Sequence, residues 1–285
     1  MELIEEQLTG PLQGVALRPV GMAGRPVGVI VAAGSSGRLD VARARLLAEQ
    51  GALVVALRWF GGEGQPPGVC EVPLETFMAA IDYLEAQNAR RIGIVGLSKG
   101  AEAALLVACY DTRVDAMVAC APSSVVWAYV EPGADEESYR FRSSWTWRSE
   151  PLPFVPYDEA WRPVERDGLV SYRGQYEASL RAFPDAAQVA AIPVERARAD
   201  LLLIAGGDDA VWPAVWFAEE LAARRRAHGR QVEVVSYADA GHRVILPGEA
   251  SPPPATRLAH GGSEAADRAL GVMAWPRVQA LLHGK

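Results

Sequence analysis

The feature that most constrains the fold is a regular alternation of apolar runs and helical stretches. The apolar runs read as strands covered on both faces and lie at 28–33, 53–57, 92–95, 115–121, 201–205 and 232–237. The helical patterns lie at 39–50, 74–87, 99–110, 213–227 and 263–282. Strands that alternate with helices predict an α/β fold, in which a mainly parallel sheet carries helices on both faces.

The alternation stops once, between about residues 123 and 198. This stretch is rich in tryptophan and proline and is too long for a plain loop, so we predict a lid or cap inserted into the domain. Ligands of parallel sheets bind at the carboxyl ends of the strands, where such an insertion would lie. A chain of 285 residues suffices for a single α/β domain over 1–285 that contains it.

The segment "RIGIVGLSKGAEAALL" has the pattern G-x-S-x-G, with Ser98 at its centre, between a predicted strand and a predicted helix. Gly96 and Gly100 remove two Cβ atoms, which lets the strand and the helix approach closely around a strained turn. The serine hydroxyl then lies at a helix N-terminus, which favours a developing anion. We predict that Ser98 is a nucleophile; the alternative is a polar residue in an ordinary turn.

A nucleophilic serine needs a base, and the chain has four histidines. His228 and His283 lie at predicted helix ends, and His260 lies in a loop after the proline-rich "SPPPA". His242 follows the last predicted strand, in "SYADAGHRVILP", where a loop at the carboxyl edge of the sheet would carry it toward Ser98. His242 is therefore the predicted base.

The base must be oriented by an acid, and "LLLIAGGDDAVWP" supplies two candidates after a buried strand. We predict Asp209 as the acid and Asp208 as a turn or capping residue. The order Ser98, Asp209, His242 is the order of α/β-hydrolases.

An oxyanion hole needs two amides, and we predict those of Lys99 and Ser35, with Ser36 as the alternative to Ser35. The Lys99 side chain has two interpretations: attraction for a phosphate-rich carrier, or a helix-surface pair with Glu102, which we favour.

Tryptophans of the insertion and of the loop after Asp209 are candidates for the walls of an acyl pocket, although packing alone could equally explain them. These candidates are Trp127, Trp145 and Trp212.

Composition excludes several classes of protein. A net charge of −7 argues against nucleic acid as the main partner, and no run approaches the about 18 apolar residues of a membrane helix. The start, "MELIEEQL", is acidic where a secretory signal is basic, which predicts a cytoplasmic protein. Cys70, Cys109 and Cys120 lack metal or redox spacing and read as buried free thiols. No metal and no cofactor is expected.

The chain resembles the C-terminal catalytic domain of the family of acyl-CoA thioesterases and bile acid-CoA:amino acid N-acyltransferases. The resemblance covers most of residues 28–250 and is most specific in "GLSKGAEAALL", "SSWTWRSEPLPFVPYD" and "AGHRVILP". It implies an α/β-hydrolase fold and acyl transfer from a coenzyme A thioester to water or an amine. By resemblance, Ser98, Asp209 and His242 correspond to the catalytic triad.

Two differences from the family bear on function. Animal members carry a β-sandwich domain before the catalytic one, whereas here only residues 1–27 precede the first predicted strand, as expected of a stand-alone form. The N-acyltransferases of the family use a cysteine nucleophile where this chain has Ser98, and a serine suits hydrolysis better.

We therefore predict a serine hydrolase that cleaves acyl thioesters, bound to coenzyme A or another carrier, through a covalent acyl-enzyme. The alternatives are an acyltransferase or carboxylesterase acting on a biosynthetic or carrier-bound intermediate, and a binding protein that keeps the fold without turnover. The sequence leaves the oligomeric state open.

Overall fold

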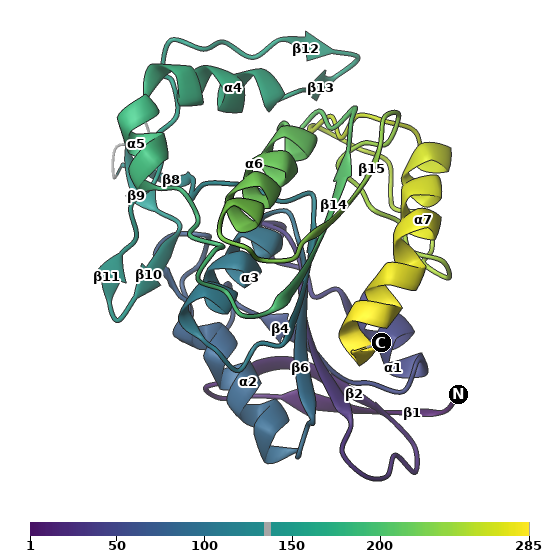
Figure 1. Ribbon diagram of the computed structural model, residues 1–285. Coiled ribbons are helices and arrows are strands. Elements are labelled where there is room, and N and C mark those ends of the chain that lie inside the picture. Colours follow the sequence, from purple (N-terminus) through teal and green to yellow (C-terminus); the bar gives the residue numbers. More distant parts are fainter. Residues whose placement is uncertain (134–137, 285) are drawn as a thin grey trace.

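A computed structural model describes residues 1–133 and 138–284, and its centre is an eight-stranded sheet (Figure 1). The spatial order is β1-β2-β4-β3-β6-β7-β14-β15. All strands run parallel except β2, which is antiparallel to both of its neighbours. The strands are β1 (Leu3–Leu8), β2 (Gln13–Pro19), β3 (Val27–Ala32), β4 (Leu53–Arg58), β6 (Arg91–Leu97), β7 (Ala116–Cys120), β14 (Asp200–Gly206) and β15 (Glu233–Tyr237).

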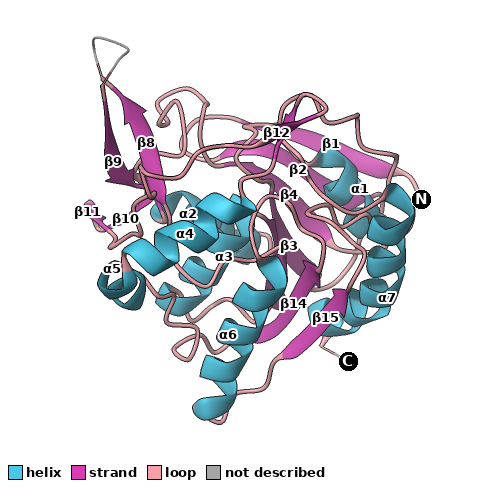
Figure 2. Cartoon of the chain, turned by 90° about the horizontal axis from the view of Figure 1, so that it is seen from above, coloured by secondary structure: helices cyan, strands magenta, loops and turns pink. Residues whose placement is uncertain are grey.

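Helices cover both faces of this sheet, which confirms the predicted architecture (Figures 1 and 2). One apolar core lies under α2 (Glu75–Ala86), α3 (Lys99–Tyr110) and α6 (Ala214–Ala227). A second core lies on the other face, under α1 (Val41–Glu49) and α7 (Glu264–His283). The central strands are buried on both faces, which explains why their sequences are continuous apolar runs.

The hairpin of β1 and β2 was not predicted from the sequence. The β1 sequence, LIEEQL, is mostly exposed, so it carries little of the apolar pattern that identifies a strand. Strand β1 is instead held by backbone pairing with β2, from Leu3 opposite Pro19 to Leu8 opposite Gly14. The acidic side chains of this edge strand oppose pairing with another chain.

The stretch from 123 to 198 has secondary structure of its own. It holds β8 (Ala128–Pro132), β9 (Tyr139–Ser143), β10 (Trp145–Trp147), β11 (Glu150–Pro151), β12 (Glu165–Arg166), β13 (Leu169–Val170), α4 (Arg173–Ala182) and α5 (Pro184–Val189). Strand β10 pairs with β5 (Val72–Pro73), which attaches the stretch to the chain before α2. In Figure 1, α4, α5, β12 and β13 lie together at the top of the view.

Helix α4 is tied to the loop that follows β14. The Arg173 N–H donates to the carbonyl of Ala210 over 3.2 Å. The Arg173 guanidinium donates to the carbonyls of Gly207 and Asp209 over 3.1 and 3.2 Å. The stretch from 123 to 198 therefore contacts the loop that carries the predicted catalytic acid.

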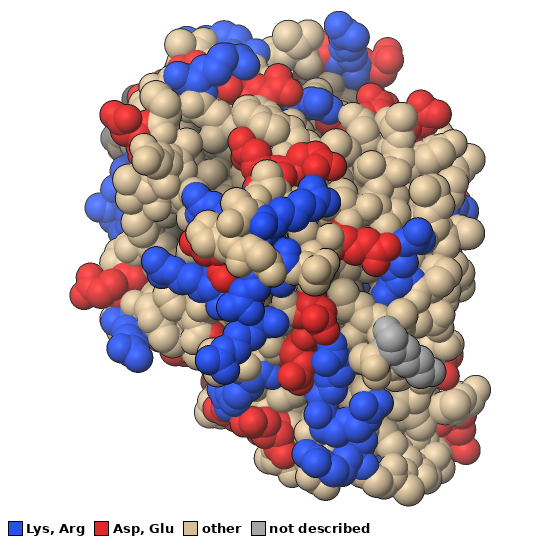
Figure 3. All heavy atoms as spheres, viewed as in Figure 1, with Lys and Arg blue, Asp and Glu red and all other residues tan. Residues whose placement is uncertain are grey.

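The surface seen in Figure 3 carries both basic and acidic side chains among other residues, and several of the basic ones gather in the lower half of the view. This face therefore presents mixed charge. Within residues 1–133 and 138–284, no helix has the length and apolarity needed to cross a membrane.

Candidate active site

Ser98 lies in the sharp turn between β6 and α3, with φ 56° and ψ −122°. A non-glycine residue with positive φ is strained and persists only where its surroundings fix it. Here the Ser98 N–H donates to the carbonyl of Cys120 over 2.9 Å. The Ser98 carbonyl accepts from the N–H groups of Ala101 and Glu102 over 2.9 and 3.0 Å. Strand β7 and the first turn of α3 thus hold the serine in this conformation.

The two glycines of the motif are required by close approach, as the sequence predicted. A Cβ on Gly96 would lie 2.4 Å from the carbonyl oxygen of Gly100. A Cβ on Gly100 would lie 2.3 Å from the carbonyl oxygen of Ala32, at the end of β3. Side chains at either position would push α3 away from the sheet and displace Ser98.

Asp209 and His242 form a buried hydrogen-bonded pair. The Oδ2 atom of Asp209 lies 2.7 Å from Nδ1 of His242, and the two residues are 1% and 7% exposed. The other carboxylate oxygen, Oδ1, accepts from the N–H groups of Val211 and Trp212 over 2.8 and 3.1 Å. A carboxylate at Nδ1 assigns the proton to that nitrogen and leaves Nε2 as an acceptor.

Ser98 lies at the same edge of the sheet as this pair, because β6, β14 and β15 are parallel and all three residues follow their carboxyl ends. Within the described parts of the chain, no hydrogen bond joins Ser98 Oγ to the His242 ring. Bonds between a nucleophile and its base often tighten only when substrate is bound. The structure thus joins two of the three predicted residues directly and brings the third to their edge.

The predicted oxyanion donors also lie near the turn. A Cβ on Gly34 would lie 3.3 Å from the Ser98 Cβ, so the loop after β3 passes directly beside the serine. Ser35 follows in this loop and is exposed. Lys99 is the first residue of α3, where an N–H has no intrahelical acceptor. Ser36, the alternative, accepts from the Arg38 N–H through its Oγ over 3.4 Å.

The Lys99 side chain pairs with Glu102, as we favoured, but the pair is buried and does not lie on a helix surface. Its Nζ donates to the two carboxylate oxygens of Glu102 over 2.9 and 3.0 Å and to Ser144 Oγ over 2.8 Å. Burial lowers the pKa of Lys99, and the charge of Glu102 acts to raise it. With these partners and only 7% exposure, the ammonium is not free to bind a carrier phosphate.

The three candidate tryptophans are at most 1% exposed. Trp127 stacks on Tyr157 with ring centroids 5.9 Å apart, and Trp145 lies 5.2 Å from Trp59. These contacts agree with the packing interpretation for Trp127 and Trp145. Trp212 differs, because its ring lies edge-on to the His242 ring at 5.5 Å, and within the described residues its buried indole N–H has no hydrogen-bond partner.

A third loop, which the sequence did not single out, connects two others by hydrogen bonds. These are the acid loop after β14, which carries Asp209, and the histidine loop after β15, which carries His242. The His260 carbonyl accepts from the N–H groups of His242 and Ala210 over 2.8 and 3.2 Å. The Asp208 carboxylate accepts from the Gly262 N–H over 2.8 Å. Residues 260–262, which we call the brace, thus contact both loops. The only signal in the sequence was "HGG" after a proline-rich stretch.

We expect that Gly261→Ala will strongly destabilise the protein, because a Cβ at this position would lie 1.7 Å from the carbonyl oxygen of Asp208. Gly261 also has φ +71°. Backbone overlap of this kind, added to a left-handed conformation, is expected to cost about 3 kcal/mol or more. Urea unfolding of the purified variant measures the loss.

The matched control for this prediction is Gly229→Ala. Gly229 has nearly the same φ, +68°, but nothing lies within 4 Å of the position that its methyl group would take. The free energy of unfolding of this variant should fall by only about 1 kcal/mol, the cost of placing an alanine in a left-handed conformation. Equal losses in the two variants would show that the brace does not pack as tightly as described.

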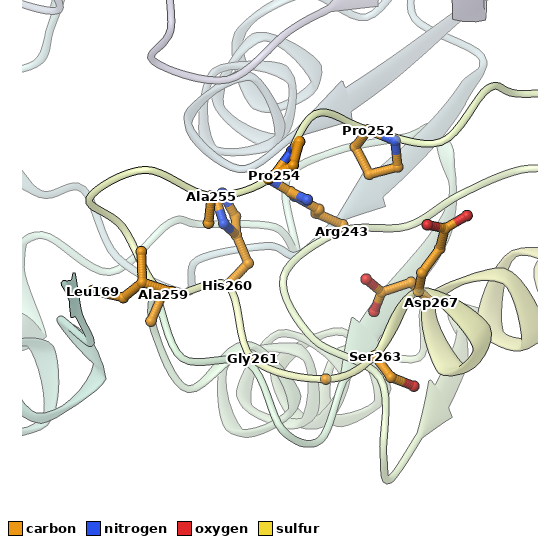
Figure 4. A pocket seen from close by; sticks show the side chains of 12 residues that line it. Leu169, Arg243, Pro252, Pro254, Ala255, Ala259, His260, Gly261, Ser263 and Asp267 are labelled. Carbon is orange, nitrogen blue, oxygen red and sulfur yellow. The ribbon is translucent and has the colours of Figure 1, made fainter. Parts of the chain in front are cut away.

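A cavity of about 370 Å³ lies beside the histidine loop and is lined in part by the brace (Figure 4). Arg243, His260 and Asp267 are among the residues around it, and Ser98 is not. Burial, together with the charge of Arg243, lowers the pKa of His260 to about 4, so this histidine is neutral at neutral pH. Within the described residues, no group of three or more potential ligands could hold a metal ion.

Comparison with known proteins identifies related sequences. The family described as "BAAT / Acyl-CoA thioester hydrolase C terminal" matches residues 72–284. Human acyl-coenzyme A thioesterase 1 is 29% identical over 224 residues, which are 77% of this chain and 49% of the human protein. Rat acyl-coenzyme A amino acid N-acyltransferase 2 is 28% identical over 249 residues, covering 85% of this chain and 54% of the rat protein. The chain spans about half the length of these relatives.

Among solved structures, a Klebsiella pneumoniae protein assigned as a dienelactone hydrolase is similar over 100% of both chains, with a TM-score of 0.58 and 17% sequence identity. At this identity the similarity concerns the fold alone. Together with the strand order, it shows that the chain has the α/β-hydrolase fold.

Proposed function

The chain belongs to the BAAT and acyl-CoA thioester hydrolase C-terminal family, and from this premise we propose that it cleaves acyl-CoA thioesters through a covalent acyl-enzyme on Ser98. The observation that carries the proposal is the buried 2.7 Å hydrogen bond between Asp209 and His242, at the edge of the sheet that also holds the strained Ser98 turn. A buried acid that orients a histidine beside a serine is the arrangement that activates a hydroxyl.

In the first step, His242 Nε2 accepts the proton of Ser98 Oγ while Oγ bonds to the carbonyl carbon of the thioester. The N–H groups of Lys99 and Ser35 donate to the resulting oxyanion, and each such donor is typically worth about 3 kcal/mol. The carbon–sulfur bond then breaks, and the leaving thiolate takes the proton from His242. The acyl group remains on Ser98 as an oxygen ester.

In the second step, a water molecule gives a proton to His242 and attacks the ester carbonyl. The same two amides stabilise the second oxyanion, and Ser98 leaves with the proton from His242. The products are a free thiol and a carboxylic acid. Throughout, Asp209 stays ionised and stabilises the imidazolium that forms in each step.

In this proposal residues 1–285 act as one catalytic domain, and residues 123–198 form a lid above its site. The bonds from Arg173 of α4 to the Asp209 loop support this position of the lid. Trp212 is the proposed wall of the acyl site, since it lies edge-on to His242. The proposed location is a reducing compartment such as the cytoplasm, because within the described residues Cys70, Cys109 and Cys120 form no disulfide.

The test is incubation with a panel of acyl-CoA thioesters and simple carboxylic esters. Thiol release and intact protein mass are followed together, and peptide mass spectrometry locates any acyl adduct. We expect thiol release, with a transient mass gain on the peptide that contains Ser98. An adduct on another residue, or no cleavage of any thioester or ester, would contradict the proposal.

The same assay separates hydrolysis from transfer, which the rat N-acyltransferase relative makes the second candidate function. Amino acids and alcohols are supplied as acceptors, and the products are separated by mass. We expect the free acid as the main product, because an oxygen ester on serine is less readily aminolysed than a thioester on cysteine. An amide as the main product would instead assign the chain to acyl transfer to amines.

A cysteine nucleophile is tested by alkylation with iodoacetamide at pH 8, which we expect to leave the cleavage rate unchanged. Burial raises the pKa of the Cys109 thiol to about 12 and that of Cys120 to about 11. It also raises the pKa of Cys70. Thiols that stay protonated react slowly, and unfolding in urea should make all three react. Rapid loss of activity in the folded protein would point to a thiol in the site.

A further inference from the structure

The geometry points to Glu102 and Lys99 as a positioning pair, which ties the inserted stretch to the Ser98 turn and so fixes the oxyanion-binding amide of Lys99. This inference rests on the proposed role of Ser98. Neither side chain has a part in the proton transfers described above. Both nevertheless lie in the first turn of α3, which begins directly after the serine.

Glu102 is completely buried, at 0% exposure, and its carboxylate accepts hydrogen bonds from three other residues. Two come from Lys99 Nζ, at 2.9 and 3.0 Å. A third comes from the indole N–H of Trp145 at 2.7 Å, and a fourth from the backbone N–H of Trp127 at 3.3 Å. The two tryptophans belong to the inserted stretch, so this carboxylate links it to α3 at two separate places.

Lys99 completes the connection from the other side. Its Nζ donates to Ser144 Oγ at 2.8 Å, and Ser144 Oγ in turn donates to the Trp127 carbonyl at 2.7 Å. The Lys99 ammonium also lies 5.8 Å from the centroid of the Trp145 ring. Two segments far apart in the inserted stretch, at Trp127 and at 144–145, are thereby held on the same turn of α3.

Fold stability alone gives a weak reason for such a pair. Removing two charges from water costs free energy that their attraction often fails to recover, and apolar replacements of similar volume are commonly neutral or stabilising. Directional hydrogen bonds to a buried ion do, however, hold the groups around it in one fixed arrangement. Here those groups include the residue whose amide is the proposed oxyanion donor.

The pair bears on catalysis through the position of the Lys99 N–H relative to the oxyanion. The Lys99 N–H must point to the place where the oxyanion forms, and displacement of a catalytic group by about 1 Å can cost about 10²-fold in rate. Without the pair, the described residues leave apolar packing between the first turn of α3 and the inserted stretch, and such packing tolerates small shifts. Binding of substrate would be affected less than the rate of acylation.

The test uses the double variant Lys99→Gln/Glu102→Gln, which removes both charges together and leaves no unpaired buried ion. An organophosphonate probe of serine nucleophiles reports acylation without knowledge of the natural substrate, and a short acyl-CoA thioester gives kcat and KM. We expect a melting temperature near that of the wild type, phosphonylation of Ser98 at least tenfold slower, and a lower kcat with a nearly unchanged KM.

A second ion pair at the opposite end of the same strand provides the matched control. Arg91 begins β6, and its guanidinium lies 2.6 Å from the carboxylate of Asp200, which begins β14. The double variant Arg91→Gln/Asp200→Asn should keep the phosphonylation rate of the wild type. If the glutamine pair does not fold, the apolar pair Lys99→Met/Glu102→Leu, of similar volume, carries the same expectation.

The possible outcomes separate this inference from the proposed function. If the wild type is phosphonylated on Ser98, and a folded variant that lacks the pair reacts equally fast, the pair is structural only and this inference is wrong while the proposed function stands. If wild-type Ser98 is not phosphonylated and no thioester is cleaved, the proposed function fails and the inference fails with it.

Discussion

Replacing Ser98 with alanine is expected to lower the kcat of thioester cleavage by about 10⁶-fold, the size of loss found when a serine hydrolase loses its nucleophile. Without Oγ no acyl-enzyme forms, and only the amides near the turn remain to stabilise an oxyanion. The fold should persist, because alanine keeps the Cβ and the backbone bonds of Ser98 to Cys120, Ala101 and Glu102. Thiol release and intact mass measure the loss of turnover and of the acyl adduct.

The control for this variant is Ser149→Ala. Ser149 is an exposed serine that also has positive φ, 65°, so its replacement makes a similar change in a similar backbone conformation away from the site. It should retain full activity. A Ser98→Ala protein that cleaves thioesters and esters at wild-type rates would remove the nucleophile from the proposal and favour a binding protein that keeps the fold.

Asp209→Asn is expected to lower kcat by about 10⁴-fold while leaving the protein folded. The Oδ1 atom of Asp209 accepts two backbone N–H bonds, so an asparagine would place its carbonyl oxygen there and its NH₂ group against His242. An NH₂ donor at Nδ1 makes that nitrogen an acceptor and moves the ring proton to Nε2. The histidine could then no longer accept the proton of Ser98.

Asp208→Asn is the matched control, because the neighbouring carboxylate makes a different bond. Asp208 is exposed, and among the described residues its carboxylate accepts from the Gly262 N–H alone, a bond that an asparagine carbonyl can still accept. Steady-state kinetics should show nearly wild-type kcat for this variant. If Asp208→Asn were the more damaging of the two changes, the choice of Asp209 as the acid would be wrong.

The strands β3, β4, β6, β7 and β14 could be predicted from the sequence because they are buried along most of their length on both faces and are therefore mostly apolar. Ser98 and its glycines could be found because steric rules at a strand-to-helix turn act within five residues. The contact between Asp209 and His242 could be predicted because parallel strands bring the loops that follow them to one edge of the sheet. All of these depend on local pattern plus one general rule of topology.

What could not be predicted depends on contacts between distant segments. The spacing of three residues predicts that Lys99 pairs with Glu102. It does not predict that a later part of the chain will bury the pair. Trp127 and Trp145 are aromatic residues in an insertion, and composition alone cannot say whether they face a ligand or the core. The brace at 260–262 shows no periodic pattern of apolar residues. Its contacts are backbone hydrogen bonds and close packing of its two glycines against neighbouring backbone.

The brace has a consequence for the order in which the site is made. All three candidate catalytic residues are synthesised before His260, yet the carbonyl that fixes the His242 backbone and the amide that binds Asp208 come after them. A nascent chain that has emerged only as far as residue 250 holds all three candidate residues but lacks the His260 carbonyl and the Gly262 amide. These bonds between the acid and histidine loops can therefore form only after residues 260–262 have been synthesised.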